Sequence, residues 1–248
     1  MEESLNYNDD QPYLDFENQY GISSKRAQIT AAEDTWLDTA YGDSIALDPD
    51  NSFFIPDDEL RTIINSYGEL RIGSTYYVFN DDGSYYEGGV QYLNEILSLR
   101  SLKKGQALPP HIQRVEGQLP AAVPTCRSGK RDTGYIYNSG RTWRFKYVTS
   151  IWNFPWGGRI IAKTKSYKKK SNGKWRKRRA TIGALIKGDV TRTDCDATEY
   201  IESSYKERKR RKVKVRVGPQ VFIKTYPYYV QSYHYSGKVG NHYEDLNW

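Results

Sequence analysis

Ten positively charged side chains lie between residues 163 and 179, and no Asp or Glu separates them. Ammonium and guanidinium groups pair with phosphate, sulfate and carboxylate oxygens, so the chemistry of this segment is anion binding. Tyr167 and Trp175 lie among the cations, and aromatic rings beside cations suit both sugars and bases. The residues that we expect to contact a ligand are Lys163, Lys165, Lys168, Lys169, Lys170, Lys174, Trp175, Arg176, Arg178 and Arg179.

The charge of the chain is divided between its two parts. Residues 1–100 hold 20 Asp or Glu and 5 Lys or Arg, a net charge of −15, whereas residues 101–248 have a net charge of +22. Three explanations of the basic run therefore compete. The cations protect exposed strand edges, they dock on the acidic half of the same chain, or they meet an external polyanion such as an anionic glycan, an envelope polymer or nucleic acid. A protein could also be the external partner of these cations.

The basic run is predicted to form a β-hairpin. Asn172-Gly173 is typical of a two-residue type I′ turn. With that turn, Lys169 would face Arg176 and Lys168 would face Lys177, and opposed like charges destabilise a strand pair.

Other residues that could carry chemistry form weaker patterns. Asp189, Asp194, Asp196 and Glu199 are candidates for the paired carboxylates of a glycan hydrolase. The acidic loop that begins at Asp48 lacks the sixth-position Gly of a calcium loop, and we interpret it as a loop before a helix.

The histidines and cysteines give no catalytic or metal pattern. His111, His234 and His242 match no zinc spacing, and we expect surface histidines beside aromatic residues. Cys126 and Cys195 are either one disulfide or two buried thiols. No phosphate-binding loop or nucleophile elbow is present, so we expect no cofactor, no metal and no enzymatic activity.

The hydrophobic pattern indicates an α+β chain in four parts. We expect a flexible acidic leader over residues 1–23, an acidic α+β module over 24–102, a linker rich in Pro and Gly over 103–140, and a basic antiparallel β domain over 141–248. In the last part, Trp143, Phe145 and Tyr147 alternate with Arg144 and Lys146. Period two places apolar residues on one face and cations on the other, which favours a sandwich or a barrel.

The acidic module is predicted in more detail. Helices are expected at residues 24–40, from Pro56 to Tyr67 and at residues 91–102, because apolar residues recur there at helical spacing. One strand is expected at residues 69–79, followed by a turn and a short return strand at 84–86. In the basic part, further strands are expected at 159–167, 174–186, 220–225 and 228–236.

Two stretches resemble a known group of proteins. They are Ile64–Val78, a helix followed by a strand, and Ala162–Trp175, the basic hairpin. Together they are similar to uncharacterised secreted proteins and lipoproteins of Bacteroidota. The resemblance implies export, with an anchoring cysteine upstream of Met1, and implies no catalytic residues.

These observations favour a non-enzymatic binding protein of the cell envelope or the exterior, with a basic aromatic hairpin for an anionic partner. The alternatives are a cytosolic nucleic-acid-binding protein and a glycan hydrolase. No stretch of the sequence approaches the roughly 20 apolar residues of a membrane span.

Overall fold

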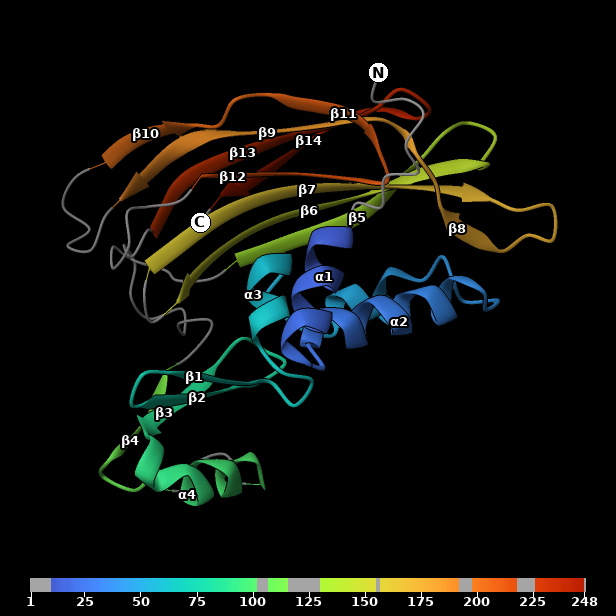
Figure 1. Cartoon of the computed structure of the whole chain (residues 1–248). Helices are drawn as coiled ribbons and strands as arrows, with labels where there is room; N and C mark the ends of the chain where they lie inside the picture. Colours follow the sequence, from blue (N-terminus) through green and yellow to red (C-terminus); the bar gives the residue numbers. More distant parts are fainter. Residues whose placement is uncertain are drawn as a thin grey trace.

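Two five-stranded antiparallel sheets pack face to face in the basic part of the chain (Figure 1). The computed structural model describes residues 10–101, 107–115, 130–154, 157–191, 198–217 and 226–247. The inner sheet has the order β12-β7-β6-β5, with β8 paired to β7, and the outer sheet has the order β10-β9-β13-β14, with β11 paired to β9. The inner-sheet strands are β5 (Lys130–Tyr137), β6 (Trp143–Phe154), β7 (Gly157–Lys169), β8 (Trp175–Lys177) and β12 (Lys212–Val217). The outer-sheet strands are β9 (Ala180–Thr191), β10 (Thr198–Glu202), β11 (Lys206–Arg210), β13 (Tyr226–Ser236) and β14 (Gly240–Asn247).

An apolar core fills the space between these sheets. Every second residue of β7 and β12 points into it, including Ile160, Ala162, Val213 and Val215. They pack against Ile182 and other buried apolar residues of the outer sheet. The predicted period-two alternation is therefore confirmed, and within the described residues the two sheets form an open sandwich and do not close into a barrel.

Three helices cover the other face of the inner sheet (Figure 1). They are α1 (Gln11–Tyr20), α2 (Lys25–Leu37) and α3 (Asp58–Ile63). Helix α2 matches the prediction, because Ser24 caps it by accepting a bond from the Ala27 amide and its apolar face is buried. Helix α1 lies in the segment that we expected to be a flexible leader. Helix α3 ends earlier than expected, which leaves Tyr67 72% exposed.

A small sheet, β1-β2-β3-β4, lies beyond the helices together with α4 (Figure 1). Its elements are β1 (Glu69–Ile72), β2 (Thr75–Phe79), β3 (Tyr85–Gly89), β4 (Ile112–Val115) and α4 (Leu93–Ser98), and short 3₁₀ turns are η1 (Ile45–Leu47), η2 (Pro49–Asn51), η3 (Val90–Tyr92) and η4 (Leu99–Ser101). The single strand predicted for residues 69–79 is wrong, because Gly73 adopts a left-handed φ of 59° and reverses the chain. Strands β4 and β5 lie within the predicted linker.

The predicted turn of the basic hairpin is also wrong. The Lys170 amide donates a 2.7 Å bond to the Lys174 carbonyl across a three-residue loop, and Gly173 takes a φ of 83° at its end. This loop shifts the register by one residue, so that Lys169 pairs with Trp175 and Lys168 with Arg176. A type I turn followed by a left-handed Gly gives this alternative hairpin, and the Asn-Gly pair alone does not distinguish the two.

Three sequence predictions lie outside the described residues. They are the strand at 220–225 and the partners of Cys126 and of Cys195.

Gly188 provides a test of the sandwich. A Cβ at this position would lie 2.1 Å from the carbonyl oxygen of Tyr229 and 2.8 Å from the Cα of Val230, and backbone atoms in a paired strand cannot move aside cheaply. We expect Gly188→Ala to lower the free energy of unfolding in urea by more than about 3 kcal/mol. Gly21→Ala is the control, because nothing lies within 4 Å of its added Cβ and only a φ of 62° is strained, at a cost of about 1 kcal/mol. Equal losses in both variants would contradict the packing described here.

Candidate functional site

The inner sheet presents a crowded row of lysines to the helices. Lys146 of β6 lies directly opposite Lys165 of β7, and Lys165 lies directly opposite Lys212 of β12. In the next row, Lys163 lies opposite Lys214. Like charges in such positions repel, so this face of the sheet needs negative partners close by.

The helical segments supply those partners at positions that their own caps determine. Asp57 is the N-cap of α3 and accepts a bond from the Glu59 amide, which places Asp58 in the first turn. Asp48 caps the η2 turn by accepting from the Asp50 amide. Glu33 points from the buried face of α2 toward the sheet. Carboxylates are favoured at such helix starts, and the turns aim them at the lysines.

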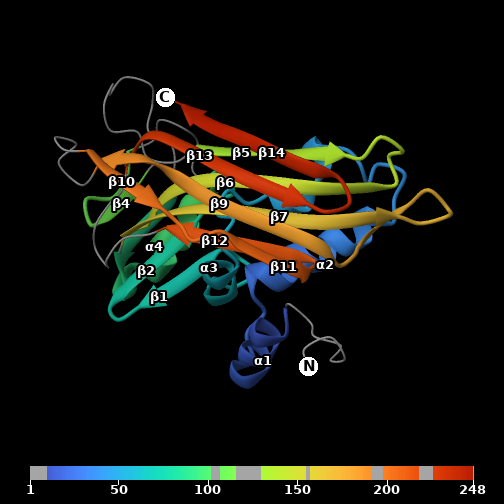
Figure 2. The same ribbon diagram turned by 90° about the horizontal axis from the view of Figure 1, so that it is seen from above.

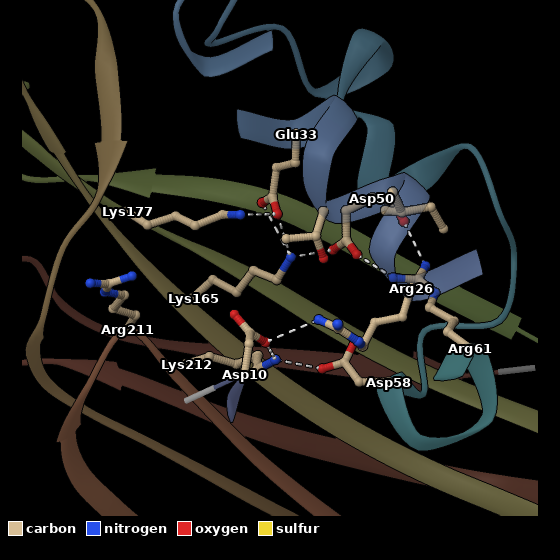
Figure 3. Close-up of a pocket in the computed structure, with 12 residues that line it drawn as sticks. Asp10, Arg26, Glu33, Asp50, Asp58, Arg61, Lys165, Lys177, Arg211 and Lys212 are labelled. Atoms are coloured by element: carbon tan, nitrogen blue, oxygen red, sulfur yellow. Dashed lines mark hydrogen bonds and ion pairs between the residues drawn. The ribbon is translucent and has the colours of Figure 1, made fainter. Parts of the chain in front are cut away.

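Asp50 lies at the centre of the resulting ion cluster (Figure 3). Its side chain is 1% exposed. The Asp50 carboxylate is 2.5 Å from Arg61 Nη1, 3.2 Å from both Lys146 Nζ and Lys165 Nζ, and 3.5 Å from Lys163 Nζ. Four cations, one from helix α3 and three from strands β6 and β7, therefore share one carboxylate.

Two further groups of ion pairs flank Asp50. On one side, Glu33 accepts a 2.7 Å bond from the Tyr167 hydroxyl and pairs with Lys165 at 3.2 Å and Lys177 at 3.0 Å. On the other side, Asp58 pairs with Lys212 at 2.8 Å. The cluster therefore runs along the whole contact between helices and sheet.

The pKa values follow from competition between burial and charge. Burial raises the pKa of Asp50 and of Asp58, but the surrounding lysines and Arg61 lower it more, so both stay well below the ordinary carboxyl range. For the lysines the balance differs from site to site. Burial lowers the pKa of Lys163 to about 7 despite Asp50 and Asp58, whereas for Lys165 the carboxylates overcome burial and raise the pKa above its usual value.

Arg144 forms a second anchor between the helices and the hairpin. Its guanidinium lies 3.9 Å from the ring centre of Tyr135 and 4.3 Å from that of Trp175, and it donates a 2.5 Å bond to the Gly42 carbonyl. The ring of Trp175 is 2% exposed. Cation–π contact of a desolvated guanidinium explains why this tryptophan is buried beneath a basic strand.

The cavity inside the ion cluster is too small for a ligand. Its volume is about 30 Å³, which is room for little more than one water molecule. The buried lysines and carboxylates therefore hold the helices on the sheet.

A wider groove of about 550 Å³ opens beside the cluster. Its walls are the α1 and α2 helices on one side and the β7–β8 hairpin on the other. Leu14, Leu37 and Trp175 form apolar parts of the lining, and Lys170, Arg176 and Arg211 lie along it as well. Concave sites with apolar walls and a few charged groups are typical ligand sites.

The structure separates the predicted ligand residues into two sets. Lys163 and Lys165 are buried in the ion cluster, and Lys170 pairs with Asp38 at 2.6 Å. Lys168 and Lys169 are half-buried, each 5.5 Å from the ring centre of a tryptophan, Trp143 and Trp175 respectively. The remaining predicted cations are Lys174, Arg176 and Arg178, which are exposed, and Arg179, which is half-buried.

The sequence did not predict which acidic residues pair with the buried lysines. The charge difference between the two parts of the chain indicated an internal contact as one possibility. It did not identify Glu33, Asp50 or Asp58, because they come from three separate segments that only the fold brings together.

His234 is buried between the two sheets, so the expectation of a surface histidine is wrong for this residue. Its Nδ1 lies 2.9 Å from Thr164 Oγ1, and its Nε2 lies 3.0 Å from Ser232 Oγ and 3.1 Å from Thr149 Oγ1. Burial, with a smaller effect of His242, lowers the pKa of His234 to about 3, so the ring is neutral and these hydroxyls satisfy both nitrogens.

The acids considered for glycan hydrolysis do not meet within the described residues. Tyr200 pairs with Asp189 and Glu199 pairs with Val190, so Asp189 and Glu199 lie on opposite faces of the outer sheet. Asp194 and Asp196 lie outside the described residues. Across the part of the chain that the structure describes, no three His, Cys, Asp or Glu side chains form a metal-binding group.

Comparison with known proteins gives a similarity to one solved structure. No family model matches the chain, and no curated protein matches it. Among solved structures, a DUF4848 family protein from Bacteroides thetaiotaomicron is similar over 96% of this chain and 89% of its own, with 13% identity and a TM-score of 0.23. That organism belongs to the Bacteroidota, as do the secreted proteins and lipoproteins that the two sequence motifs resemble. No described helix is both long and apolar enough to cross a membrane.

The ion cluster predicts opposite responses to two substitutions. Asp50→Asn leaves Lys146, Lys163 and Lys165 around a neutral amide, so we expect the free energy of unfolding at pH 7 to fall by about 3–5 kcal/mol. Lys163→Met removes a cation whose pKa is lowered to about 7 by burial and leaves three others on Asp50, so stability should stay within about 1 kcal/mol of wild type or rise. Urea unfolding measures both, and a larger loss for Lys163→Met than for Asp50→Asn would overturn this account of the cluster.

Acid should weaken the cluster in a defined pH window. The pKa values of Glu33, Asp50, Asp57 and Asp58 are lowered in the folded chain, so their charges stabilise it above the unfolded carboxyl pKa of about 4. This stability is lost as pH falls through that value toward the lower folded pKa values. Urea midpoints measured from pH 7 to pH 3 should therefore fall steeply below about pH 5. Asp58→Asn should flatten the profile, and Asp81→Asn, at a site 74% exposed, should leave its shape unchanged.

Proposed function

We propose that the protein is a non-enzymatic binding protein whose basic hairpin, residues 163–179, takes an anionic polymer. One observation carries the proposal. In the described part of the chain, the inner members of the basic run are neutralised by carboxylates, whereas five others have no ion pair with a carboxylate. These five are Lys168, Lys169, Lys174, Arg176 and Arg178.

The position of these five cations favours an extended ligand. They lie along both strands of the hairpin and its loop, and three of them are exposed. Lys168 and Lys169 are held beside tryptophan rings at 5.5 Å, so their positions are set before a ligand arrives. Charges that are fixed in advance lose less entropy on binding.

The groove beside the hairpin supports the same function. Arg176 lines it and is exposed, while Lys177 on the same strand is held by Glu33 and Asp34 at 3.0 Å and 2.9 Å. A polymer along the hairpin would place its anionic groups against Arg176 and its apolar parts against the half-buried Leu14. The export implied by the sequence resemblance would bring this surface to the anionic polymers of a cell envelope.

The charge of the hairpin can be tested through the salt dependence of binding. A heparin oligosaccharide, as a sulfated probe, should bind at low salt, with an affinity that falls as a power of the salt concentration. Arg176→Gln with Arg178→Gln should weaken binding and reduce the slope of log affinity against log salt by about 1.5, because each lost contact removes about 0.7–0.9. Fluorescence anisotropy of the labelled probe measures both.

The matched control removes two exposed charges elsewhere. Arg71→Gln with Lys238→Gln makes the same change in net charge on β1 and on the β13–β14 turn. An equal loss of slope in this control, or no binding of heparin at low salt, would remove the hairpin as the binding surface. Stronger competition by RNA than by the sulfated polysaccharide would transfer the function to nucleic-acid binding.

A further inference from the structure

The outer sheet presents an aromatic face on the side opposite the helices. Inward-facing residues such as Ile186, Val230 and Leu246 belong to the sandwich core, so the alternate residues point outward. In the described part of the chain, no helix or strand covers this face, as the view from above shows (Figure 2). Its outward tyrosines, here called the tyrosine face, are Tyr200, Tyr205, Tyr229, Tyr233, Tyr235 and Tyr243.

Three rings of the tyrosine face, those of Tyr205, Tyr233 and Tyr243, form a strip across the strands. The ring centres of Tyr205 and Tyr233 are 5.9 Å apart, and those of Tyr233 and Tyr243 are 5.0 Å apart. Tyr205 lies over Gly183, where an added Cβ would be 2.4 Å from its hydroxyl oxygen. Tyr205 and Tyr243 are nevertheless 46% and 56% exposed, and Tyr200 is 60% exposed. The strip is therefore held against the sheet by close packing while its ring surface stays open to a partner.

Polar groups alternate with the rings along the strands. The Tyr205 hydroxyl donates a 2.6 Å bond to Glu207. Gln231 Nε2 donates 2.8 Å to Asp245 Oδ1 and 3.1 Å to the Tyr229 hydroxyl. Each carboxylate keeps acceptor positions beyond the bond it already receives, because an ionised carboxylate has about four lone-pair sites. The face thus offers flat aromatic area with hydrogen-bond acceptors beside it.

The charge of this face differs from that of the hairpin. The outward residues of the described strands include four acids, Asp189, Glu202, Glu207 and Asp245, and two cations, Lys187 and Lys209. The local balance is therefore negative, which disfavours the anionic polymers that suit the hairpin. Lys187 lies directly opposite Glu202, and Lys209 lies on the same face of β11 as Glu207, so cations already accompany two of the acids and the face offers no run of acids to a polycation.

We infer that the tyrosine face binds an uncharged polysaccharide. A sugar ring has an apolar face of C–H groups, which suit the electron-rich faces of the tyrosines, and a rim of hydroxyls, which suit the carboxylates and Gln231. Both features occur together here, and neither requires a charged partner. This surface is separate from the proposed function, and the two would allow one molecule to contact a neutral and an anionic polymer at the same time.

Affinity electrophoresis tests the inference, in native gels that contain a neutral glucan, mannan or xylan. We expect at least one of the three to retard the wild-type protein. Tyr205→Ala with Tyr243→Ala should weaken this binding about tenfold or more, since two stacking surfaces are lost. Tyr243→Phe keeps the ring and should retain binding, which separates loss of the stacking ring from loss of the hydroxyl.

Two controls separate this surface from others. Tyr67→Ala removes a tyrosine that is 72% exposed on another part of the molecule and should change nothing. Arg176→Gln with Arg178→Gln should leave the retardation intact, and the tyrosine variants should leave heparin binding intact, so the two proposals fail independently. The inference is overturned if none of the three glycans retards the protein, if the double tyrosine variant binds as wild type does, or if polylysine binds this face in place of the glycans.

Discussion

Lysines on adjacent strands impose the main constraint on this structure. Three neighbouring strands place Lys146, Lys165 and Lys212 side by side, so the sheet cannot be buried on that face unless carboxylates are buried with it. The helical segments are arranged to meet this need, with Asp50 shared among several cations and Glu33 and Asp58 on either side. The position of each helix on the sheet follows from where its acids must lie.

The inner sheet is consequently covered on its two faces by different interactions. Apolar packing against the outer sheet is tolerant of small displacements, because it depends on area and shape. Ion pairs at 2.6–3.2 Å fix the helical layer to particular side chains of the sheet. Arg144, held among aromatic rings, extends the same arrangement to the hairpin. The cations left outside this network are the ones that we propose for an external partner.

Local sequence signals predicted the parts of the fold that depend on local interactions. Helix α2, the alternation in β6 and β12, and the antiparallel strands of the sandwich followed from spacing alone. The short hairpin at Gly73 and the register at Gly173 did not, because each depends on which of two allowed turns the neighbouring strands accept. For the ion cluster, the sequence indicated only that the acidic part of the chain could contact the basic part. Its acids and lysines come from distant segments: Lys146 lies 98 residues after Asp48 and Lys165 lies 132 residues after Glu33, so no local pattern joins them.

The long separation between the paired charges has a consequence for how the chain is made. Glu33 leaves the ribosome 132 residues before Lys165, and Asp58 leaves it 154 residues before Lys212. The acidic segments must therefore remain without their counter-ions through much of synthesis, and the last lysine strand completes the arrangement. Such non-local closure is slow, and its acids keep the nascent segment hydrated until the basic strands emerge. The uneven charge along this polypeptide thus keeps the early segments hydrated until the basic strands have been synthesised.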